Sequence, residues 1–289
     1  MLVSLKDAQQ QYTTFLVSAG KANATVIAYT KDVEQLVEFV QKKGKFEIAA
    51  VSTEDIREFK SLLKKQRYTD KSISRKINSI KSFFRYLISQ NIITENVAVS
   101  VTHPKIVEKP PGVLSKVEYR ALRDACKGDI RIAAIVEVLL QTGMRISELA
   151  NLKVQDIDLE RNVIHITPNN SLAGRKIPLN KAAKDALLKY LQVRPRAREK
   201  TIFLTKTCRP FLVRNIRTTI DRYFRLAGIR HAKINDLRNT FIVEQLRNGT
   251  PLVYVSQLVG HKRITTTEKY IQLIDGAGKM SPTIKIEEL

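Results

Sequence analysis

Apolar residues recur every three or four positions over most of the first hundred residues, a spacing that lines them up on one face of an α-helix. The spacing is regular over residues 25–43 and again over residues 70–89. Ser52 opens a further stretch with Ser-Thr-Glu-Asp, a typical capped helix start. We therefore expect residues 4–100 to be helical throughout and residues 1–102 to form a helical domain.

This pattern ends at residues 103–112, which contain three prolines and end in a glycine. Proline lacks the amide donor that a helix needs, so this segment is expected to be an extended interdomain linker. A capping box follows at Ser115-Lys116-Val117-Glu118, and the apolar stretch of residues 129–141 predicts a buried helix. These features indicate a second domain, residues 113–289.

The second domain begins differently from the first. Apolar and polar residues alternate over residues 162–167 and 175–179, which predicts two paired strands with turn residues between them. Helical spacing then returns over residues 180–193, 211–227, 235–248, 251–259 and 264–274. The chain is thus expected to be mostly α with a small antiparallel β-sheet.

Charge indicates the partner. The chain has 50 Lys and Arg against 28 Asp and Glu, a formal net charge of +22. Such a surface repels itself unless a polyanion neutralises it, and nucleic acid is the usual polyanion, although ribosome association or mere solubility is the alternative. The helix at residues 70–89 carries candidate phosphate contacts, unless these form an ordinary solvated face. They are Arg75, Lys76, Lys81 and Arg85.

Other classes of protein are not indicated. Cys126 and Cys208 have no companion cysteines, so neither a disulfide framework nor a zinc cluster is expected. The first residues become polar too early for a signal peptide, and no apolar run approaches the length of a membrane span. We expect a protein of the cytoplasm, where it meets the nucleoid, with no membrane partner and no bound metal.

Two arginines stand where a phosphate could be held. Arg145 lies at the corner after the buried helix, where a guanidinium can present two donors at once, and Glu148 is placed to orient it. A structural Arg–Glu pair is the alternative. Arg238 lies in the first turn of a later helix, after Asp236, which we expect to cap that helix.

A histidine and a tyrosine complete the candidate chemistry. His261 follows Gly260 at an expected helix end, and Tyr270 comes nine residues later. Taken separately, such a histidine is more often structural and such a tyrosine more often belongs to the core.

Together, in this order and at this spacing, these residues resemble the sequence boxes of the tyrosine recombinase, or phage integrase, family. Residues 141–152 are similar to the family's first arginine box. Residues 235–241 are similar to the second, which is usually His-x-Leu-Arg-His-Thr-Phe. Val259-Gly260-His261 is similar to a Leu-Gly-His element, and Thr266-Thr267-Glu268-Lys269-Tyr270 to a Thr-Thr-x-x-Tyr element. The resemblance covers nearly the whole chain.

The resemblance implies a reaction. Arg145 and Arg238 would neutralise the scissile phosphate, His261 would donate a hydrogen bond to it, and Tyr270 would attack it to give a 3′-phosphotyrosine and a free 5′ hydroxyl. Strand exchange would then pass through a Holliday junction. The covalent link keeps the energy of the broken bond, so neither a metal nor another cofactor is implied.

The resemblance also implies partners and a shape. The two domains would form a C-shaped clamp on double-stranded DNA with specific recombination sites. Four copies would act as a homotetramer on two such sites, and the free protein would be a monomer or weak oligomer. Integration, excision, resolution and the movement of a mobile element all share this chemistry.

The chain departs from the family's pattern in the second box and the hairpin. Asn235 and Asn239 stand where histidines are usual, and Asn170 stands where the family has a lysine that protonates the leaving oxygen. Lys176 is the candidate for that acid and Arg175 is second, unless both only contact the DNA backbone. Arg175 is accordingly also a candidate DNA-binding residue.

These departures keep two rival functions open: a DNA-binding accessory protein on the same scaffold, and relaxation of supercoils in the manner of a type IB topoisomerase. Beyond Tyr270, the residues Ile284, Ile286 and Leu289 are candidates for docking on a neighbouring copy, the alternative being a frayed tail.

Overall fold

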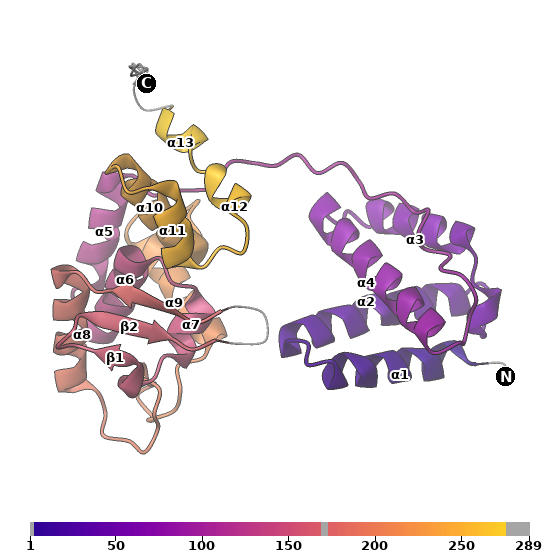
Figure 1. Cartoon of the computed structure of the whole chain (residues 1–289), viewed down its shortest axis with the longest axis horizontal. Coiled ribbons are helices and arrows are strands. Elements are labelled where there is room, and N and C mark those ends of the chain that lie inside the picture. Colours follow the sequence, from indigo (N-terminus) through magenta and orange to yellow (C-terminus); the bar gives the residue numbers. More distant parts are fainter. Residues whose placement is uncertain (1–2, 169–172, 276–289) are drawn as a thin grey trace, which may run out of the picture. The chain divides into compact units, whose positions relative to one another are not determined.

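Two units of the chain, Met1–Glu108 and Lys109–Leu289, pack separately in a computed structural model, which describes residues 3–168 and 173–275 (Figure 1). The boundary between them falls inside the predicted linker, residues 103–112. Hydrogen bonds hold both ends of that segment, each to a different unit. Ser74 shares a hydrogen bond of 3.1 Å with His103 in the first unit, and Asn239 donates to the Gly112 carbonyl at 2.9 Å in the second.

The first unit is a helical bundle. Its elements are α1 (Leu5–Ser18), α2 (Asn23–Gln41), the 3₁₀ turn η1 (Ile48–Ala50), α3 (Thr53–Lys65) and α4 (Asp70–Ser89). Side chains of Ser4, Ser52 and Thr69 cap α1, α3 and α4 by accepting a hydrogen bond from an amide of the first turn. The apolar faces predicted from the spacing meet in a core that includes Tyr12, Phe83 and Phe84.

The expectation of helix up to residue 100 is wrong. The last long helix of this unit, α4, ends at Ser89, because Asn91 adopts a left-handed φ of 55°. The chain then returns along α4 without regular structure. Asn96 donates from its side chain to the Lys81 carbonyl at 3.1 Å, and Val101 is buried in the core of the unit.

A buried carboxylate corrects one predicted DNA contact. Asp32 on α2 is 1% exposed and accepts hydrogen bonds from Lys76 at 2.9 Å, from Ser79 at 2.7 Å and from Arg75. Lys76 is itself only 3% exposed and also donates to Gln35. The prediction that Lys76 contacts phosphate is therefore wrong for this structure, since its ammonium is occupied inside the bundle. Arg85 is exposed, as expected for a surface cation.

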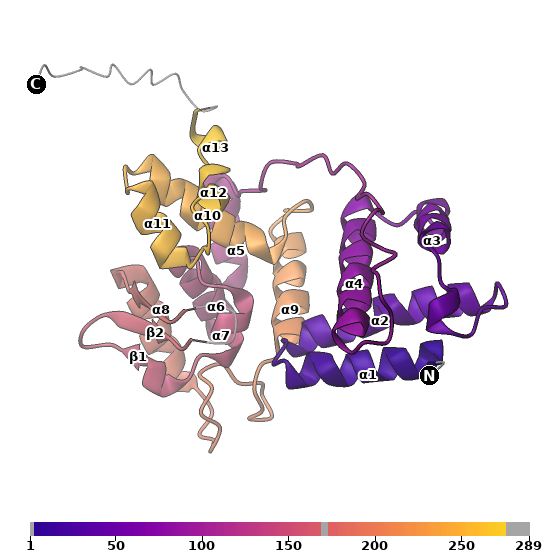
Figure 2. The same ribbon diagram turned by 45° about the vertical axis from the view of Figure 1, so that its right-hand side comes forward.

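The second unit is built around α6. Its helices are α5 (Lys116–Cys126), α6 (Ile130–Thr142), α7 (Ile146–Asn151), α8 (Lys181–Val193), α9 (Val213–Leu226), α10 (Ile234–Arg247), α11 (Leu252–Val259), α12 (Thr265–Glu268) and α13 (Gln272–Asp275), with a 3₁₀ turn η2 (Val154–Asp156). α6 is apolar nearly all round and packs against α5, α8 and α10 (Figure 2). This packing brings the start of α10 close to the end of α6.

A small sheet completes this unit. Its strands β1 (Ile157–Asp158), β2 (Val163–Ile166) and β3 (Arg175–Pro178) are antiparallel in the order β1-β2-β3. His165 is paired with Lys176, and both side chains face solvent. The mostly α fold with a small antiparallel sheet is confirmed. The two-residue β1 is too short to give an alternating pattern, and the pattern missed it.

One predicted helix is two. Residues 264–274 were expected to form a single helix, but α12 and α13 are separate and Tyr270 lies between them. The Tyr270 amide bonds to the carbonyl three residues before it, and the Leu273 amide bonds to the Tyr270 carbonyl. These tight turns replace the α-helical pattern and aim Tyr270 into the unit, where it is 8% exposed.

Among the described residues, no helix is long and apolar enough to cross a bilayer, and no group of His, Cys, Asp and Glu could hold a metal ion. The predicted docking residues Ile284, Ile286 and Leu289 lie outside the described residues.

We predict that Asp55→Ala lowers the free energy of unfolding of the first unit by roughly 2 kcal/mol. Asp55 is 1% exposed, completes the capping box of α3 and binds Lys43 at 2.6 Å and Lys45 at 2.5 Å. Urea titration of the full chain, read from amide hydrogen exchange in α3, measures the loss. Asp7→Ala, at the exposed start of α1, is the matched control.

The same carboxylate predicts a pH dependence. Burial alone raises the pKa of Asp55, but hydrogen bonds from Lys43, Lys45 and Ser52 outweigh it and hold the pKa well below its usual value. A depressed pKa stabilises the fold above the unfolded-state value of about 4, and this contribution is lost as the pH falls further. Protection of α3 should therefore drop below about pH 4. If the Asp55→Asn variant loses protection of α3 below about pH 4 as steeply as the wild type does, Asp55 is not the cause.

Candidate active site

Three arginines meet at the carboxyl end of α11. Arg145 donates to the carbonyls of Val259 at 3.3 Å and Gly260 at 2.6 Å. Arg238 also donates to the Val259 carbonyl, at 2.7 Å, and Arg175 donates from Nε to the Leu258 carbonyl at 2.6 Å. The last carbonyls of a helix have no partner inside the helix and carry partial negative charge, so they attract donors of this kind.

Two glycines make these approaches possible. Gly143 ends α6 with a left-handed φ of 58°, and its carbonyl accepts from Arg238 at 2.5 Å. A Cβ at this position would lie 2.3 Å from the ring of Phe241. Gly260 ends α11 with a φ of 68°, and a Cβ there would meet the Arg175 guanidinium at 3.0 Å. Both turns therefore need glycine for conformation and for space.

Glu148 holds two of the arginines. Its buried carboxylate binds Arg175 through two hydrogen bonds of 2.8 Å and Arg145 through one of 3.0 Å, and it accepts the Arg145 amide at 2.8 Å. Burial raises its pKa, but the Arg175 and Arg145 hydrogen bonds outweigh burial and leave the pKa below its ordinary value. Glu148 is thus ionised at neutral pH, and it forms a pair with Arg145, a contact that fits both the orienting role and the structural pair left open by the sequence.

The cluster retains excess positive charge, since three guanidinium groups face one carboxylate. Burial, and then repulsion from Arg145, lowers the pKa of Arg238 to about 10, which still leaves it protonated at neutral pH. A half-buried positive excess of this kind favours an anion that can accept several hydrogen bonds.

His261 lies beside Tyr270. Its Nδ1 shares a hydrogen bond of 2.8 Å with the Thr267 hydroxyl, and the two rings stack with centroids 6.3 Å apart. Burial, followed by repulsion from Arg238, Arg145 and Arg175, lowers the pKa of His261 to about 4. The imidazole is therefore neutral at physiological pH and can donate one hydrogen bond without carrying charge.

Tyr270 donates its hydroxyl hydrogen bond to Oδ1 of Asn239 at 2.8 Å. Burial raises the pKa of Tyr270, Arg238 opposes that shift and Asp236 adds to it. The phenol is thus protonated at neutral pH in the protein without DNA. Asp236, expected to cap α10, is instead the third residue of a capping box: the helix starts at Ile234, and the Asp236 carboxylate accepts the Lys233 amide at 2.8 Å.

A cavity of about 320 Å³ joins several of the predicted residues. Its walls include Arg145, Asn235, Arg238 and Tyr270, together with Ser147 and Asn239. The four predicted residues come from positions between 145 and 270, so only folding brings them together. His261 reaches the site through its stacking on Tyr270.

Two predicted residues lie apart from this cavity. Lys176 is exposed on β3 and does not line it. Arg175 was expected to contact DNA or to act as an acid, and this is wrong for the structure described. Its side chain is 10% exposed, and all three guanidinium nitrogens bond to Glu148 or Leu258. Asn170 lies outside the described residues.

The candidate contacts on α4 are divided as well. Arg75 is 44% exposed while it pairs with Asp32, and Lys81 donates to the Val99 carbonyl at 3.1 Å. With the exposed Arg85 they leave a basic strip on the helix, in which Lys81 is half-buried and from which Lys76 is missing.

Sequence reasoning missed two residues that shape the site: Arg175 as a third arginine of the cluster, and Asn239 as the partner of Tyr270. Arg175 has one indirect signal, because it begins a strand directly after a turn-rich segment. The only signal for Asn239 is that it stands at a position of the second box where the family usually has a histidine. Neither signal identifies the partner, which is a carboxylate 27 residues away for Arg175 and a hydroxyl 31 residues away for Asn239.

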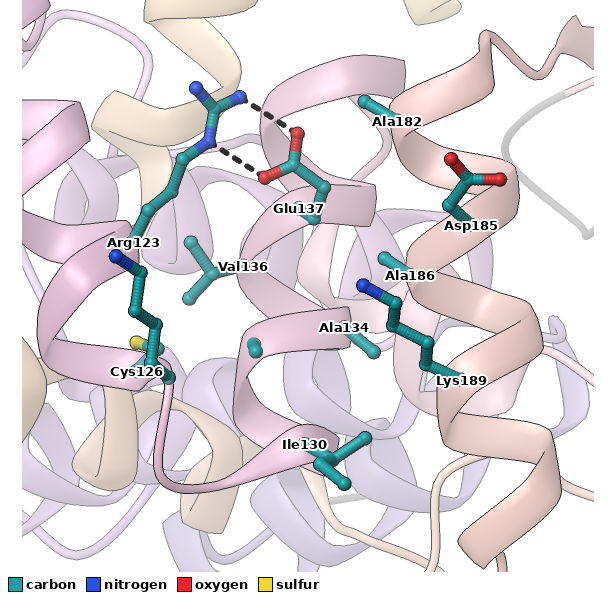
Figure 3. Close-up of a pocket in the computed structure, with 12 residues that line it drawn as sticks. Arg123, Cys126, Ile130, Ala134, Val136, Glu137, Ala182, Asp185, Ala186 and Lys189 are labelled. Carbon is teal, nitrogen blue, oxygen red and sulfur yellow. Dashed lines mark hydrogen bonds and ion pairs between the residues drawn. The ribbon is translucent and has the colours of Figure 1, made fainter.

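Another hollow, of about 340 Å³, lies between α5, α6 and α8 (Figure 3). Arg123 there is paired with Glu137 through two hydrogen bonds of 2.7 Å, so its charge is neutralised. Burial, and then Asp129, raises the pKa of the Cys126 thiol to about 12, which leaves it protonated and unreactive. The candidate chemistry therefore belongs to the arginine-lined cavity.

Comparison with known proteins assigns the family. The phage integrase family model matches residues 112–276, and the model of the phage integrase N-terminal SAM-like domain matches residues 10–91. Tyrosine recombinase XerC of Herpetosiphon aurantiacus is 30% identical over 276 residues, 91% of this chain and 90% of the relative. XerC of Oceanobacillus iheyensis is 32% identical over 260 residues, 85% of this chain and 84% of the relative.

Solved structures agree with this assignment. The crystal structure of XerA recombinase is 28% identical, covers 92% of each chain and has a TM-score of 0.52. A lambda integrase dimer bound to a core site is 18% identical, covers 99% of this chain and 81% of that chain, and has a TM-score of 0.75, which shows a shared fold. Since the family model covers more than half of the sequence, the chain belongs to the phage integrase family, that of the tyrosine recombinases.

Proposed function

We propose that this recombinase cleaves and rejoins DNA at specific sites with Tyr270 as the nucleophile and with Arg145 and Arg238 as the clamp on the scissile phosphate. One observation carries the proposal: the buried Tyr270 and both arginines line the same cavity of about 320 Å³. A phosphodiester placed there would meet donors on one side and the phenol on another.

The arginines would supply the electrostatic part of catalysis. Each guanidinium has five N–H groups, and the hydrogen bonds to Gly143 and Val259 account for two of those of Arg238. Donors remain for the nonbridging phosphate oxygens, whose charge grows in the transition state. Neutral His261 would donate one more hydrogen bond.

In the proposed reaction, the Tyr270 oxygen gives up its proton to water and bonds to phosphorus, while the bond from phosphorus to the 5′ oxygen breaks. That oxygen takes up a proton and leaves as a hydroxyl. A 5′ hydroxyl from a second duplex then attacks the phosphotyrosine, which restores Tyr270 and joins the exchanged strands. Lys176 is the proposed source of the proton for the leaving oxygen, and Asn235 a proposed hydrogen-bond donor in the cavity wall.

The assembly is proposed on the same basis. We propose domains at residues 1–102 and 113–289 that close as a C-shaped clamp on DNA, with Arg75, Lys81 and Arg85 toward phosphates. Four copies would work on two sites, and a lambda integrase tetramer bound to a Holliday junction has the same fold at 18% identity. The Tn1549 transposon integrase, 20% identical, has it too, which is compatible with a mobile element. The reaction would take place on the nucleoid, in the cytoplasm.

We expect Tyr270→Phe to bind DNA as the wild type does and to form no covalent complex, because only the nucleophilic hydroxyl is removed. Wild-type protein incubated with sheared genomic DNA should yield covalent complexes that survive denaturation. Sequencing the DNA in these complexes identifies the cleavage site. A nicked suicide duplex that carries this site is then used to compare covalent capture by the variants. Tyr254→Phe, half exposed on α11, is the control. If the Tyr270→Phe protein is captured and the control is not, Tyr254 is the nucleophile. If even wild type is never captured, the protein is an accessory DNA-binding protein.

Arg145→Ala and Arg238→Ala should each slow single-turnover cleavage of that duplex at least about 100-fold, because part of the transition-state charge would lose its donors. Binding, measured by fluorescence anisotropy, should weaken far less, since many other basic residues contact phosphates. Arg217→Ala, on the exposed face of α9, is the control for a lost surface charge. Near-wild-type cleavage by either site variant would remove that arginine from the mechanism.

If Lys176 protonates the leaving oxygen, Lys176→Ala should cleave an ordinary duplex slowly and recover on a duplex with sulfur in place of the bridging 5′ oxygen. Sulfur leaves without a proton, so the missing acid no longer matters. Lys181→Ala, at the exposed start of α8, is the matched control. Equal slowing of Lys176→Ala on both substrates would make Lys176 a DNA contact instead.

A further inference from the structure

We infer that Asn239 is the positioning residue for the Tyr270 nucleophile, and that it is itself held by the end of the interdomain linker at Gly112. The inference rests on the role proposed above for Tyr270. It concerns a chain of hydrogen bonds that runs from the Gly112 carbonyl through the Asn239 carboxamide to the Tyr270 hydroxyl.

The hydrogen bonds of Asn239 fix the direction of its carboxamide. Nδ2 donates to the Gly112 carbonyl at 2.9 Å and to the Asp236 carboxylate at 3.2 Å. Both partners only accept, so the nitrogen must face them and Oδ1 must face Tyr270, whose hydroxyl lies 2.8 Å away. A reversed carboxamide would set its oxygen against two acceptors, the Gly112 carbonyl and the Asp236 carboxylate.

This arrangement acts on the nucleophile in a defined way. The Tyr270 proton points toward Asn239, so the lone pairs of the phenol oxygen are left for other directions, and both residues line the cavity that Arg238 also lines. An amide oxygen cannot take a proton at neutral pH, so Asn239 is not a base. It accepts from the protonated phenol and thereby favours that form.

The linker end is fitted closely to the same place. A Cβ on Gly112 would lie 3.0 Å from both carboxylate oxygens of Asp236. Two residues later, the Leu114 amide donates to the Thr240 hydroxyl at 2.8 Å, and that hydroxyl donates to the Asp236 carbonyl at 2.6 Å. The linker therefore enters the second unit along the first turns of α10. Displacing its end would release the carboxamide that holds Tyr270.

Two substitutions at Asn239 should move the Tyr270 titration in opposite directions. Asn239→Ala removes the acceptor that favours the protonated phenol, so the pKa of Tyr270 should fall. Asn239→Asp places a carboxylate beside the phenol, which opposes the phenolate, so the pKa should rise. Shifts of both signs are expected only if the side chain at position 239 lies beside the Tyr270 hydroxyl.

The titration is measured on the full chain without DNA, by fluorine NMR of protein labelled with 3-fluorotyrosine. The Tyr270 resonance is the one that Tyr270→Phe lacks. Asn248→Ala, the same substitution at the exposed end of α10, should leave the titration unchanged. An unchanged titration in Asn239→Ala, or shifts of the same sign in both Asn239 variants, would overturn the inference.

A second measurement tests the effect on cleavage, with the suicide duplex defined above. Loss of alignment should slow covalent capture by Asn239→Ala and Asn239→Asp on the order of 10- to 100-fold, with the affinity for the duplex within about twofold of wild type. Gly112→Ala should slow capture as well, because its methyl group would lie 3.0 Å from the Asp236 carboxylate, so that the linker end or this carboxylate, which also binds Asn239, must shift.

The two failures can be told apart. If wild-type protein is never captured while the NMR shifts have opposite signs, the proposed function fails and the positioning contact stands. If wild type is captured and Asn239→Ala is captured equally fast, the inference fails and the nucleophile assignment stands. If Asn239→Ala fails to fold, the Asn239→Asp and Gly112→Ala variants still test the inference, because it requires slow covalent capture by both.

Discussion

The carbonyl groups at the end of α11 hold three elements of the second unit together at the candidate site. Arg145, Arg175 and Arg238 come from three separate elements, and each donates to one or two of the last carbonyls of this helix. Without these carbonyls and the carboxylate of Glu148, three guanidinium groups would repel one another at close range. The helix end thus fixes the start of α7, the strand β3 and the second turn of α10 around one point, and the cluster keeps excess positive charge.

That excess charge sets the protonation states of the other groups. His261 is neutral because it is buried and surrounded by arginines, and Tyr270 is protonated because burial outweighs the attraction of Arg238. The free site is therefore cationic at the arginines and neutral at Tyr270. A phosphodiester would match the arginines first, and the phenol would face it through the contact with Asn239. In the proposed reaction, the positive charge is therefore in place before Tyr270 loses its proton.

The same residue types serve structure elsewhere in the chain. Lys76 and Asp32 form a buried pair in the first unit, and Asp55 holds the start of α3 with two lysines. The sequence pattern places a basic residue on a helix with apolar and basic positions. It does not show whether a neighbouring helix brings a carboxylate to that residue. For that reason Lys76 was predicted to contact phosphate, although its ammonium is inside the bundle.

The sequence by itself determined what depends on local spacing: the helices, the hairpin strands, the second domain, the strongly basic surface, and the four residues that carry the family resemblance, Arg145, Arg238, His261 and Tyr270. Tertiary structure decided which partners these side chains take. It broke the last predicted helix around Tyr270, removed Arg175 from the surface, and placed Asn239 between the linker and the Tyr270 hydroxyl. The physical reason is the range of the interactions. Hydrophobic periodicity is set by residues three or four positions apart. The contacts of Arg175 and Asn239 span from 3 to 127 positions, and all but the shortest depend on how the helices pack.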